Sequence, residues 1–214
     1  LGSSSAALVA GIFLGDAVSG GTLGREGVLH LAADLEGHPD NVAPALYGGV
    51  TLSASDGTAR WRTAHLPWPD GWRIAFGVPA FEVPTREARA VLTPHVTRAD
   101  AILTASRLAF WPIALLTGDP TLLRVASRDV MHEPQRHPLL PGFAAAQRDL
   151  LAAGVWAAFL SGAGPTLGVV CDDAHLGPAQ SILARYAGTE GQVVTPRIGA
   201  AATVEGSWTQ RAAP

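Results

Sequence analysis

Apolar residues follow a helical spacing at the start of the chain and a strand-like alternation further along it. The opening stretch 3–19 is apolar on nearly every side, which predicts a buried helix. Residues 25–36 carry apolar positions on one face, which predicts a second helix. A third, short helix is predicted from Pro39 to Ala45, because proline suits the first helical turn.

Beyond this region strands and helices mix without a regular alternation. Strands are predicted at residues 50–53, 59–63, 73–78, 155–160, 167–171 and 192–195. Helices are predicted at residues 85–92, 99–116, 120–127, 142–153 and 174–186. The first two strands flank an Asp-Gly turn and predict a hairpin, and a loop rich in proline and tryptophan at 66–72 separates two lobes. This mixture predicts an α+β fold.

Composition narrows the class of protein. Of 214 residues, 48% are hydrophobic and 15% charged, which is enough to bury a core. The net charge of -3 comes without a basic run, so nothing indicates nucleic-acid binding. No apolar stretch is expected to approach the roughly 20 residues of a membrane span. The single cysteine, Cys171, excludes an internal disulfide and is expected to be a buried thiol in a cytoplasmic protein.

The opening residues join a glycine and three hydroxyls to the start of a helix. They are Gly2, Ser3, Ser4 and Ser5. Free backbone N–H groups and the helix dipole make such a start an anion site, and glycine lets a phosphate approach the backbone. A hydroxyl there can also hold a magnesium ion that bridges phosphates. A capped buried helix without a ligand explains the same pattern, so both interpretations stay open.

A second stretch, residues 36–44, gathers two carboxylates, an imidazole and an amide. These belong to Glu36, His38, Asp40 and Asn41. A glycine and a proline between them fix a tight bend, and carboxylate oxygen suits magnesium, which usually takes one or two such ligands. A helix-capping turn with solvated polar groups is the alternative.

Three further features carry weaker signals. Residues 161–166 form a turn between two apolar strands, and Gly162 and Gly164 there allow a close approach of a ligand or of another backbone. A plain hairpin explains that turn equally well. Arg89 and Arg136 sit among polar residues, and guanidinium groups bind carboxylates in a bidentate manner. Two surface charges are the simpler interpretation of these arginines.

Taken together, these stretches resemble the homoserine kinases of the GHMP kinase superfamily. Residues 2–7 look like the tail of the GHMP phosphate-binding motif, and 161–166 resembles the third GHMP motif. Residues 36–44 resemble the block Glu-Gly-His-Pro-Asp-Asn-Val-Ala-Pro, the most specific of the set. Residues 84–92 and 134–141 are similar to two further family segments. The order matches along nearly the whole chain.

The resemblance implies a role for each candidate residue. Ser4 and Glu36 match the magnesium ligands, and Gly2, Ser3, Ser4, Ser5, Gly162 and Gly164 match positions that bind ATP. His38, Arg89 and Arg136 match positions that hold L-homoserine. Asn41 matches a residue beside the transferred phosphate, and Asp40 either accepts the hydroxyl proton or orients the substrate. The implied reaction is ATP-dependent phosphorylation of the L-homoserine hydroxyl in threonine biosynthesis.

The implied fold has two lobes and an incomplete start. Residues 1–66 are expected to be the remainder of an S5-like N-terminal lobe, 67–200 a ferredoxin-like α/β-sandwich lobe, and 201–214 a loose tail. The chain starts at Leu1 inside the phosphate motif, which we interpret as a truncation of the family's N-terminal segment. Ala163 replaces a common serine, and Thr93 interrupts a Val-Leu-Pro sequence.

The alternatives are another GHMP kinase, acting on mevalonate or a sugar, and a fragment that is inactive because its N-terminal segment is missing. A homodimer stays open as the assembly.

Overall fold

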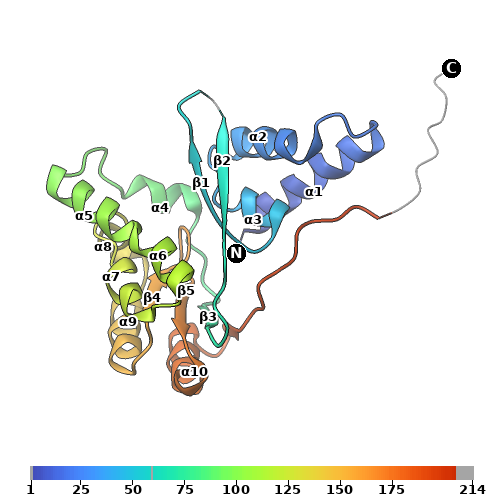
Figure 1. Ribbon diagram of the computed structural model, residues 1–214. Coiled ribbons are helices and arrows are strands. Elements are labelled where there is room, and N and C mark those ends of the chain that lie inside the picture. Colours follow the sequence, from blue (N-terminus) through green and yellow to red (C-terminus); the bar gives the residue numbers. More distant parts are fainter. Residues whose placement is uncertain (1, 59, 206–214) are drawn as a thin grey trace. The chain divides into compact units, whose positions relative to one another are not determined.

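The computed structural model describes residues 2–58 and 60–205, and the chain divides into two compact units (Figure 1). The N-terminal unit comprises residues 2–68 together with 198–205, and the C-terminal unit comprises residues 69–197. The sequence placed the division between residues 66 and 67. It did not foresee that the chain returns to the first unit after Arg197.

Three helices and one hairpin build the N-terminal unit. They are α1 (Ser3–Val18), α2 (Gly24–Glu36), α3 (Val42–Tyr47), β1 (Val50–Ser55) and β2 (Trp61–Leu66). The two strands are antiparallel, as the Asp-Gly turn predicts. The core gathers apolar side chains from all three helices: Val9, Val28, Leu29, Ala32, Ala33, Val42, Ala43 and Leu46.

Helix α1 departs from its sequence prediction. Its only buried residues are Ser5, Val9 and Asp16, because α2 and α3 pack along one side of the helix. Leu14 and Val18 are 45% and 49% exposed in the described chain. The expectation of a helix buried on every side is therefore wrong for the described residues.

Helix α3 begins at Val42 and not at Pro39 as predicted. The Asp40 carboxylate accepts hydrogen bonds from its neighbours, including the backbone N–H of Asn41 at 3.0 Å. Asp and Asn side chains commonly hold the backbone in such turns and so delay the start of a helix. Residues 38–41 therefore form a separate turn that precedes the helix.

The segment after Arg197 lies against the N-terminal unit. Gly49 N–H donates to the Gly199 carbonyl at 2.9 Å, and Ala202 N–H donates to the Leu46 carbonyl at 3.0 Å. Gly48 has a φ of 68°, and a Cβ there would lie 2.3 Å from the Ala200 carbonyl carbon. Within the predicted tail Ala202 is thus bonded to the unit, and residues 206–214 of that tail lie outside the described residues.

The C-terminal unit is built on a four-stranded antiparallel sheet. Its strands are β3 (Arg73–Val78), β4 (Ala157–Leu160), β5 (Leu167–Cys171) and β6 (Gln192–Val194). Their order across the sheet is β4-β5-β3-β6, with all neighbours antiparallel. In chain order this places the first and third strands at the centre, which is the ferredoxin-like arrangement. The predicted α+β fold is confirmed.

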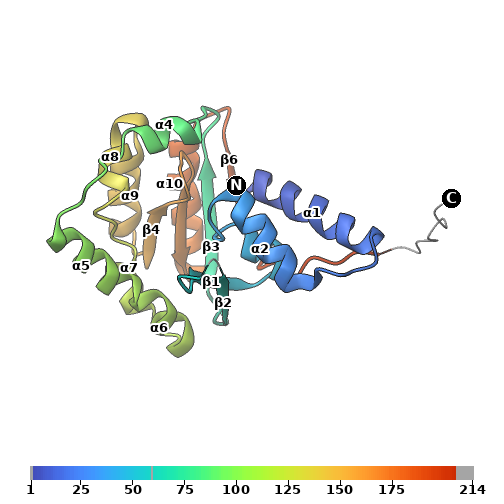
Figure 2. The same cartoon turned by 90° about the horizontal axis from the view of Figure 1, so that it is seen from above.

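Two helices, α9 (Phe143–Ala152) and α10 (Asp173–Ala187), cover one face of this sheet and contact each other (Figure 2). The shared core includes Phe143, Leu150, Leu167, Val169 and Leu183, all fully buried. The remaining helices are α4 (Thr85–Ala90), α5 (Arg98–Leu108), α6 (Phe110–Thr117), α7 (Leu123–Ala126) and α8 (Glu133–Arg136), with single 3₁₀ turns at Pro120–Leu122 and His137–Leu139. The segment 131–141, for which neither a helix nor a strand was predicted, is thus partly helical.

Small residues on β3 let α10 approach the sheet closely. The fully buried residues of β3 are Ala75 and Gly77, while Ile74, Phe76 and Val78 are half-buried. A Cβ on Gly77 would lie 3.0 Å from the Leu183 carbonyl oxygen and 3.2 Å from the Leu183 Cβ. The backbone of α10 therefore rests almost directly on the strand at this point.

One helical stretch, Arg98–Thr117, reaches the length and apolarity of a membrane span, with 20 residues and a mean hydropathy of 1.3. The expectation that no apolar stretch approaches that length is therefore wrong. The stretch is divided at Ala109 into α5 and α6. Pro112 follows three residues later, and proline has no backbone N–H to donate within a helix. A single stretch of this kind among the described residues is weak evidence for a membrane, because the core helix of a soluble protein and a signal sequence pass the same test.

Gly77→Ala should destabilise the protein by about 1–3 kcal/mol, because the added methyl group meets the backbone of α10 and cannot be relieved by a rotamer change. Gly11→Ala is the matched control: it makes the same chemical change inside α1, where nothing lies within 4 Å. There alanine should be neutral or stabilise by about 0.5–1 kcal/mol. Urea unfolding followed by circular dichroism measures both. Equal stability of the two variants would contradict the close packing.

Candidate active site

The N-terminal unit brings the start of α1 against the end of α2. Ser4 Oγ donates a hydrogen bond to Glu36 Oε1 at 3.3 Å, across 32 residues of sequence. Gly37, with a φ of 86°, ends α2 directly after this carboxylate. Gly2 has a φ of 62°, and a Cβ there would come within 3.3 Å of Asn41 Oδ1. The glycine-serine stretch and the 36–41 block therefore meet within one unit.

His38 and Asp40 form a close pair inside that block. His38 Nδ1 lies 2.5 Å from Asp40 Oδ1, the same oxygen that accepts the Asn41 N–H. The Asp40 side chain is 68% exposed, whereas the His38 side chain is 32% exposed. The carboxylate thus fixes the imidazole ring and the start of the next helix together.

The chemistry of these groups fits a magnesium-bound phosphate. Hydroxyl and carboxylate oxygens are ligands that magnesium accepts, and it usually takes only one or two from protein beside phosphate oxygens. Among the described residues no group of three or more His, Cys, Asp or Glu side chains forms a metal cage. The pair Ser4 and Glu36 is consistent with that sparse mode of binding.

The start of α1 is suited to an anion. The first turn holds no acidic side chain, so the dipole and N–H groups are not neutralised within the helix. Ser5 Oγ is buried and has no hydrogen-bond partner among the described residues. Buried hydroxyls usually have a partner, and a polar group bound at the start of α1 would supply one.

The C-terminal unit gathers the other predicted residues around Arg136. Its Nε donates to the Ala88 carbonyl at 3.0 Å, and its Nη1 donates to the Gly162 carbonyl at 3.1 Å. Ala88 directly precedes Arg89 on α4, and Gly162 belongs to the glycine-rich turn between β4 and β5. Arg136 therefore ties together three predicted segments that lie far apart in sequence.

Electrostatics support two neighbouring cations at this point. Burial lowers the pKa of Arg136, the negative charge of Asp129 raises it, and the positive charge of Arg89 lowers it. An arginine stays charged under such shifts. Arg89 and Arg136 thus repel each other, and an anion placed between them would relieve that repulsion. A guanidinium has five N–H donors, so Arg136 keeps donors beyond its two carbonyl bonds.

The two glycines of the 161–166 turn have different reasons to be glycine. A Cβ on Gly164, where φ is 91°, would lie 2.9 Å from Leu160 Cδ1 and 3.1 Å from Leu140 Cδ2. Packing alone explains that position. Gly162 has a φ of 58° and is exposed, and a Cβ there would meet no described atom within 4 Å. At Gly162 the positive φ, and not packing, favours glycine, and the space beside it is open among the described residues.

Sequence reasoning missed the acidic residues that hold these segments. Asp16 accepts backbone hydrogen bonds from Leu23 at 2.8 Å and Gly24 at 3.3 Å, at the start of α2. Asp129 accepts three backbone hydrogen bonds from residues 131–133. Glu133, buried beside β4, accepts one from Leu160. The bond between Glu133 and Leu160 joins residues 27 positions apart, and spacing alone gives no signal for such a partner.

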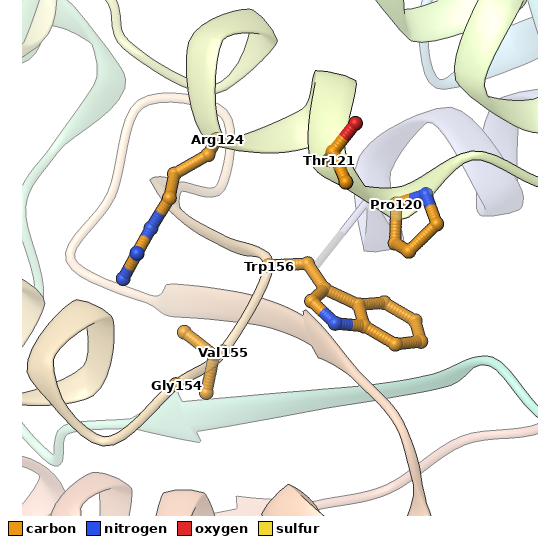
Figure 3. Close-up of a pocket in the computed structure, with 6 residues that line it drawn as sticks. All are labelled: Pro120, Thr121, Arg124, Gly154, Val155 and Trp156. Atoms are coloured by element: carbon orange, nitrogen blue, oxygen red, sulfur yellow. The ribbon is translucent and has the colours of Figure 1, made fainter.

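A cavity of about 250 Å³ lies elsewhere in the C-terminal unit. Figure 3 shows its lining, with the Trp156 indole near Pro120 and the Arg124 side chain extending away from that indole. None of the residues predicted from the sequence lines it. Cys171 has the properties expected of a structural thiol. Its sulfur is buried, and burial raises the pKa of the thiol to about 11, so the reactive thiolate is scarce at neutral pH.

Comparison with known proteins decides the family. Two family models match, the GHMP kinases N terminal domain over residues 1–49 and GHMP kinases C terminal over residues 113–188. A homoserine kinase from Thermus thermophilus is 48% identical over 199 residues, which cover 93% of this chain and 67% of that protein. The chain belongs to the homoserine kinases.

Other members of the homoserine kinases agree in sequence and in fold. A homoserine kinase from Nostoc punctiforme is 41% identical over 175 residues, covering 82% of this chain and 57% of that protein. The crystal structure of homoserine kinase from Cytophaga hutchinsonii matches with a TM-score of 0.82 at 27% identity, covering 92% of this chain and 65% of that one. The chain spans about two thirds of the length of its Thermus and Cytophaga relatives.

Tyr186→Phe should test how the glycine-rich turn is held. The Tyr186 hydroxyl donates to the Pro165 carbonyl at 2.6 Å, and its loss should cost about 1 kcal/mol of stability at neutral pH. Burial raises the pKa of Tyr186 to about 12, from 10.0. The stability that Tyr186 adds is therefore complete below pH 10 and lost as the pH rises from 10 to 12.

Urea unfolding of wild type and Tyr186→Phe between pH 7 and 12 measures this difference. The chain contains no lysine, so no lysine ammonium group titrates in that alkaline range. A stability difference that stays constant up to pH 12 would contradict the assignment.

Proposed function

We propose that the enzyme carrying this chain transfers the γ-phosphoryl group of ATP to the side-chain hydroxyl of L-homoserine. The products are O-phospho-L-homoserine and ADP, for threonine biosynthesis in the cytoplasm. The contact between Ser4 and Glu36 at the start of α1 is the observation that carries the proposal. It supplies the oxygen pair that the reaction needs, inside the segments that mark the family.

In the proposed reaction the homoserine hydroxyl oxygen forms a bond to the γ-phosphorus as the bond from that phosphorus to the bridging ADP oxygen breaks. The hydroxyl proton passes to solvent or, in the alternative role of Asp40, to its carboxylate. Such a transfer depends on positioning and on charge stabilisation, with little covalent work for the protein. Ser4 and Glu36 would hold magnesium, which when bound neutralises charge on the triphosphate.

The residues of the N-terminal unit have distinct proposed roles. Backbone N–H groups at Gly2, Ser3 and Ser5 bind phosphate oxygens at the start of α1. Asn41 lies beside the transferred phosphate. His38 binds homoserine, and Asp40 orients His38 through their 2.5 Å contact. Asp40 as acceptor of the hydroxyl proton is the alternative role.

The residues of the C-terminal unit would bind the amino acid and the nucleotide. Arg89 and Arg136 bind the homoserine carboxylate, because two adjacent guanidinium groups suit one carboxylate. The exposed Gly162 gives a phosphate access to the backbone of the turn. Gly164 shapes that turn through its packing.

Glu36→Gln should weaken magnesium binding, because an amide oxygen replaces a charged ligand. We expect the magnesium concentration for half-maximal activity to rise at least tenfold, equal to about 1.4 kcal/mol. The homoserine KM should change little. Glu26→Gln is the matched control, since Glu26 lies on the same helix with a side chain that is 67% exposed. Equal magnesium dependence of the two variants in a coupled ADP assay would remove Glu36 from the metal site.

Arg89→Gln should raise the homoserine KM by roughly 10- to 100-fold, the effect of losing a charge-assisted hydrogen bond worth about 1.5–3 kcal/mol. The ATP KM should stay within twofold. Arg86→Gln on the same helix is the control, because Arg86 is also exposed and lies outside the predicted site. A panel of homoserine, mevalonate and sugar substrates completes the assay. Phosphorylation of mevalonate or a sugar in preference to homoserine would overturn the proposed substrate.

A further inference from the structure

Glu133 is a buried carboxylate that the proposed reaction does not use. It is 6% exposed, and Asp16 is the other buried acidic residue of the described chain. Burial raises the pKa of Glu133, while hydrogen bonds from Leu160 and Gln147 lower it. Burying a charged group is costly unless its hydrogen bonds are satisfied, so the partners of this carboxylate decide whether it can remain buried.

Both carboxylate oxygens of Glu133 accept hydrogen bonds at the free edge of the sheet. Strand β4 is an edge strand, and its pairing with β5 leaves alternate backbone groups facing outward. Glu133 Oε1 accepts the Leu160 N–H at 2.7 Å. Glu133 Oε2 accepts from Gln147 Nε2 at 2.9 Å, and the same Nε2 donates to the Ala158 carbonyl at 2.9 Å. Glu133 and Gln147 therefore complete the outer edge of β4.

This edge continues directly into the candidate site. Leu160 is the last residue of β4, and the glycine-rich turn begins at the next residue. Glu133 is also the first residue of α8, the helix that ends with Arg136. The Asp129 carboxylate accepts the Glu133 N–H at 2.8 Å and so fixes the start of that helix. One carboxylate thus joins the strand that leads to Gly162 with the helix that carries Arg136.

We propose that Glu133 is a positioning residue for the homoserine kinase reaction: by joining β4 to α8, it holds the turn at residues 161–166 and the Arg136 guanidinium in the contact that binds substrate. The inference rests on the proposed function for its kinetic consequence. The 3.1 Å bond from Arg136 Nη1 to the Gly162 carbonyl is a second link between α8 and the turn that follows β4. Without Glu133, a small displacement of either segment breaks that bond.

The test compares Glu133→Gln and Glu133→Ala with Glu190→Gln in the intact enzyme. Glu190→Gln removes the same charge from an exposed loop residue. Glutamine at 133 keeps an acceptor for Leu160 but turns an amide donor toward the Gln147 donor, whereas alanine removes both contacts. Misplacement of about 1 Å can cost a hundredfold in rate, so graded effects are expected.

We expect the homoserine KM to rise about fivefold in Glu133→Gln and more in Glu133→Ala, relative to Glu190→Gln, in protein that circular dichroism shows to be folded. A purely structural role would lower the active fraction and leave the KM unchanged. Folded Glu133→Gln with the homoserine KM of the control would overturn the proposal. Should neither variant fold, Gln147→Ala, which removes one of the two contacts, provides the same comparison with a smaller expected rise.

Hydrogen exchange separates this inference from the proposed function. Backbone amides of residues 160–164 should exchange faster in Glu133→Gln than in Glu190→Gln, while those of β3 stay unchanged. Unchanged exchange at 160–164 would overturn the positioning role. If wild type and Glu190→Gln both fail to phosphorylate homoserine, the proposed substrate is wrong, and the exchange result alone then decides whether Glu133 holds the turn.

Discussion

Every backbone N–H that leaves water needs an acceptor, and in this chain acidic side chains meet that requirement at the critical junctions. Asp16 accepts the amides at the start of α2, and Asp129 accepts those at the start of α8. Asp172 caps α10 by accepting the His175 N–H at 2.9 Å. The segments that carry the candidate site residues are therefore fixed by hydrogen bonds as well as by apolar packing.

Much of the fold could be predicted from the sequence, because its elements follow local rules. The strand at 73–78 and the helix at 25–36 have the periodicity and punctuation that such elements require, and the structure has them within one residue of the predicted bounds. The incomplete burial of α1 could not be predicted, since apolar composition does not say which neighbours pack against a helix. The return of residues 198–205 to the first unit depends on long-range contacts such as that between Gly48 and Ala200.

The candidate site was predictable to the extent that its residues form contiguous motifs. Ser4 and Glu36 meet as the resemblance implies, and Arg136 reaches the turn that holds Gly162. Glu133 and Gln147 belong to no such motif. Their bonds to β4 join residues that are 27 and 11 positions apart, and no sequence pattern predicts partners at those separations. Gly164 belongs to a motif yet is explained by its contacts with Leu160 and Leu140. Membership of a motif thus does not decide between ligand binding and packing.

The single thiol of the chain has a practical consequence. Cys171 is the last residue of the central strand β5 and is fully buried between the sheet and its helices. Reagents that alkylate thiols attack the thiolate, which is scarce at neutral pH when the pKa is about 11. Covalent labelling at this one sulfur therefore requires that the packing around β5 open. The rate of labelling therefore reports how often the C-terminal unit opens, and no probe has to be engineered into the protein.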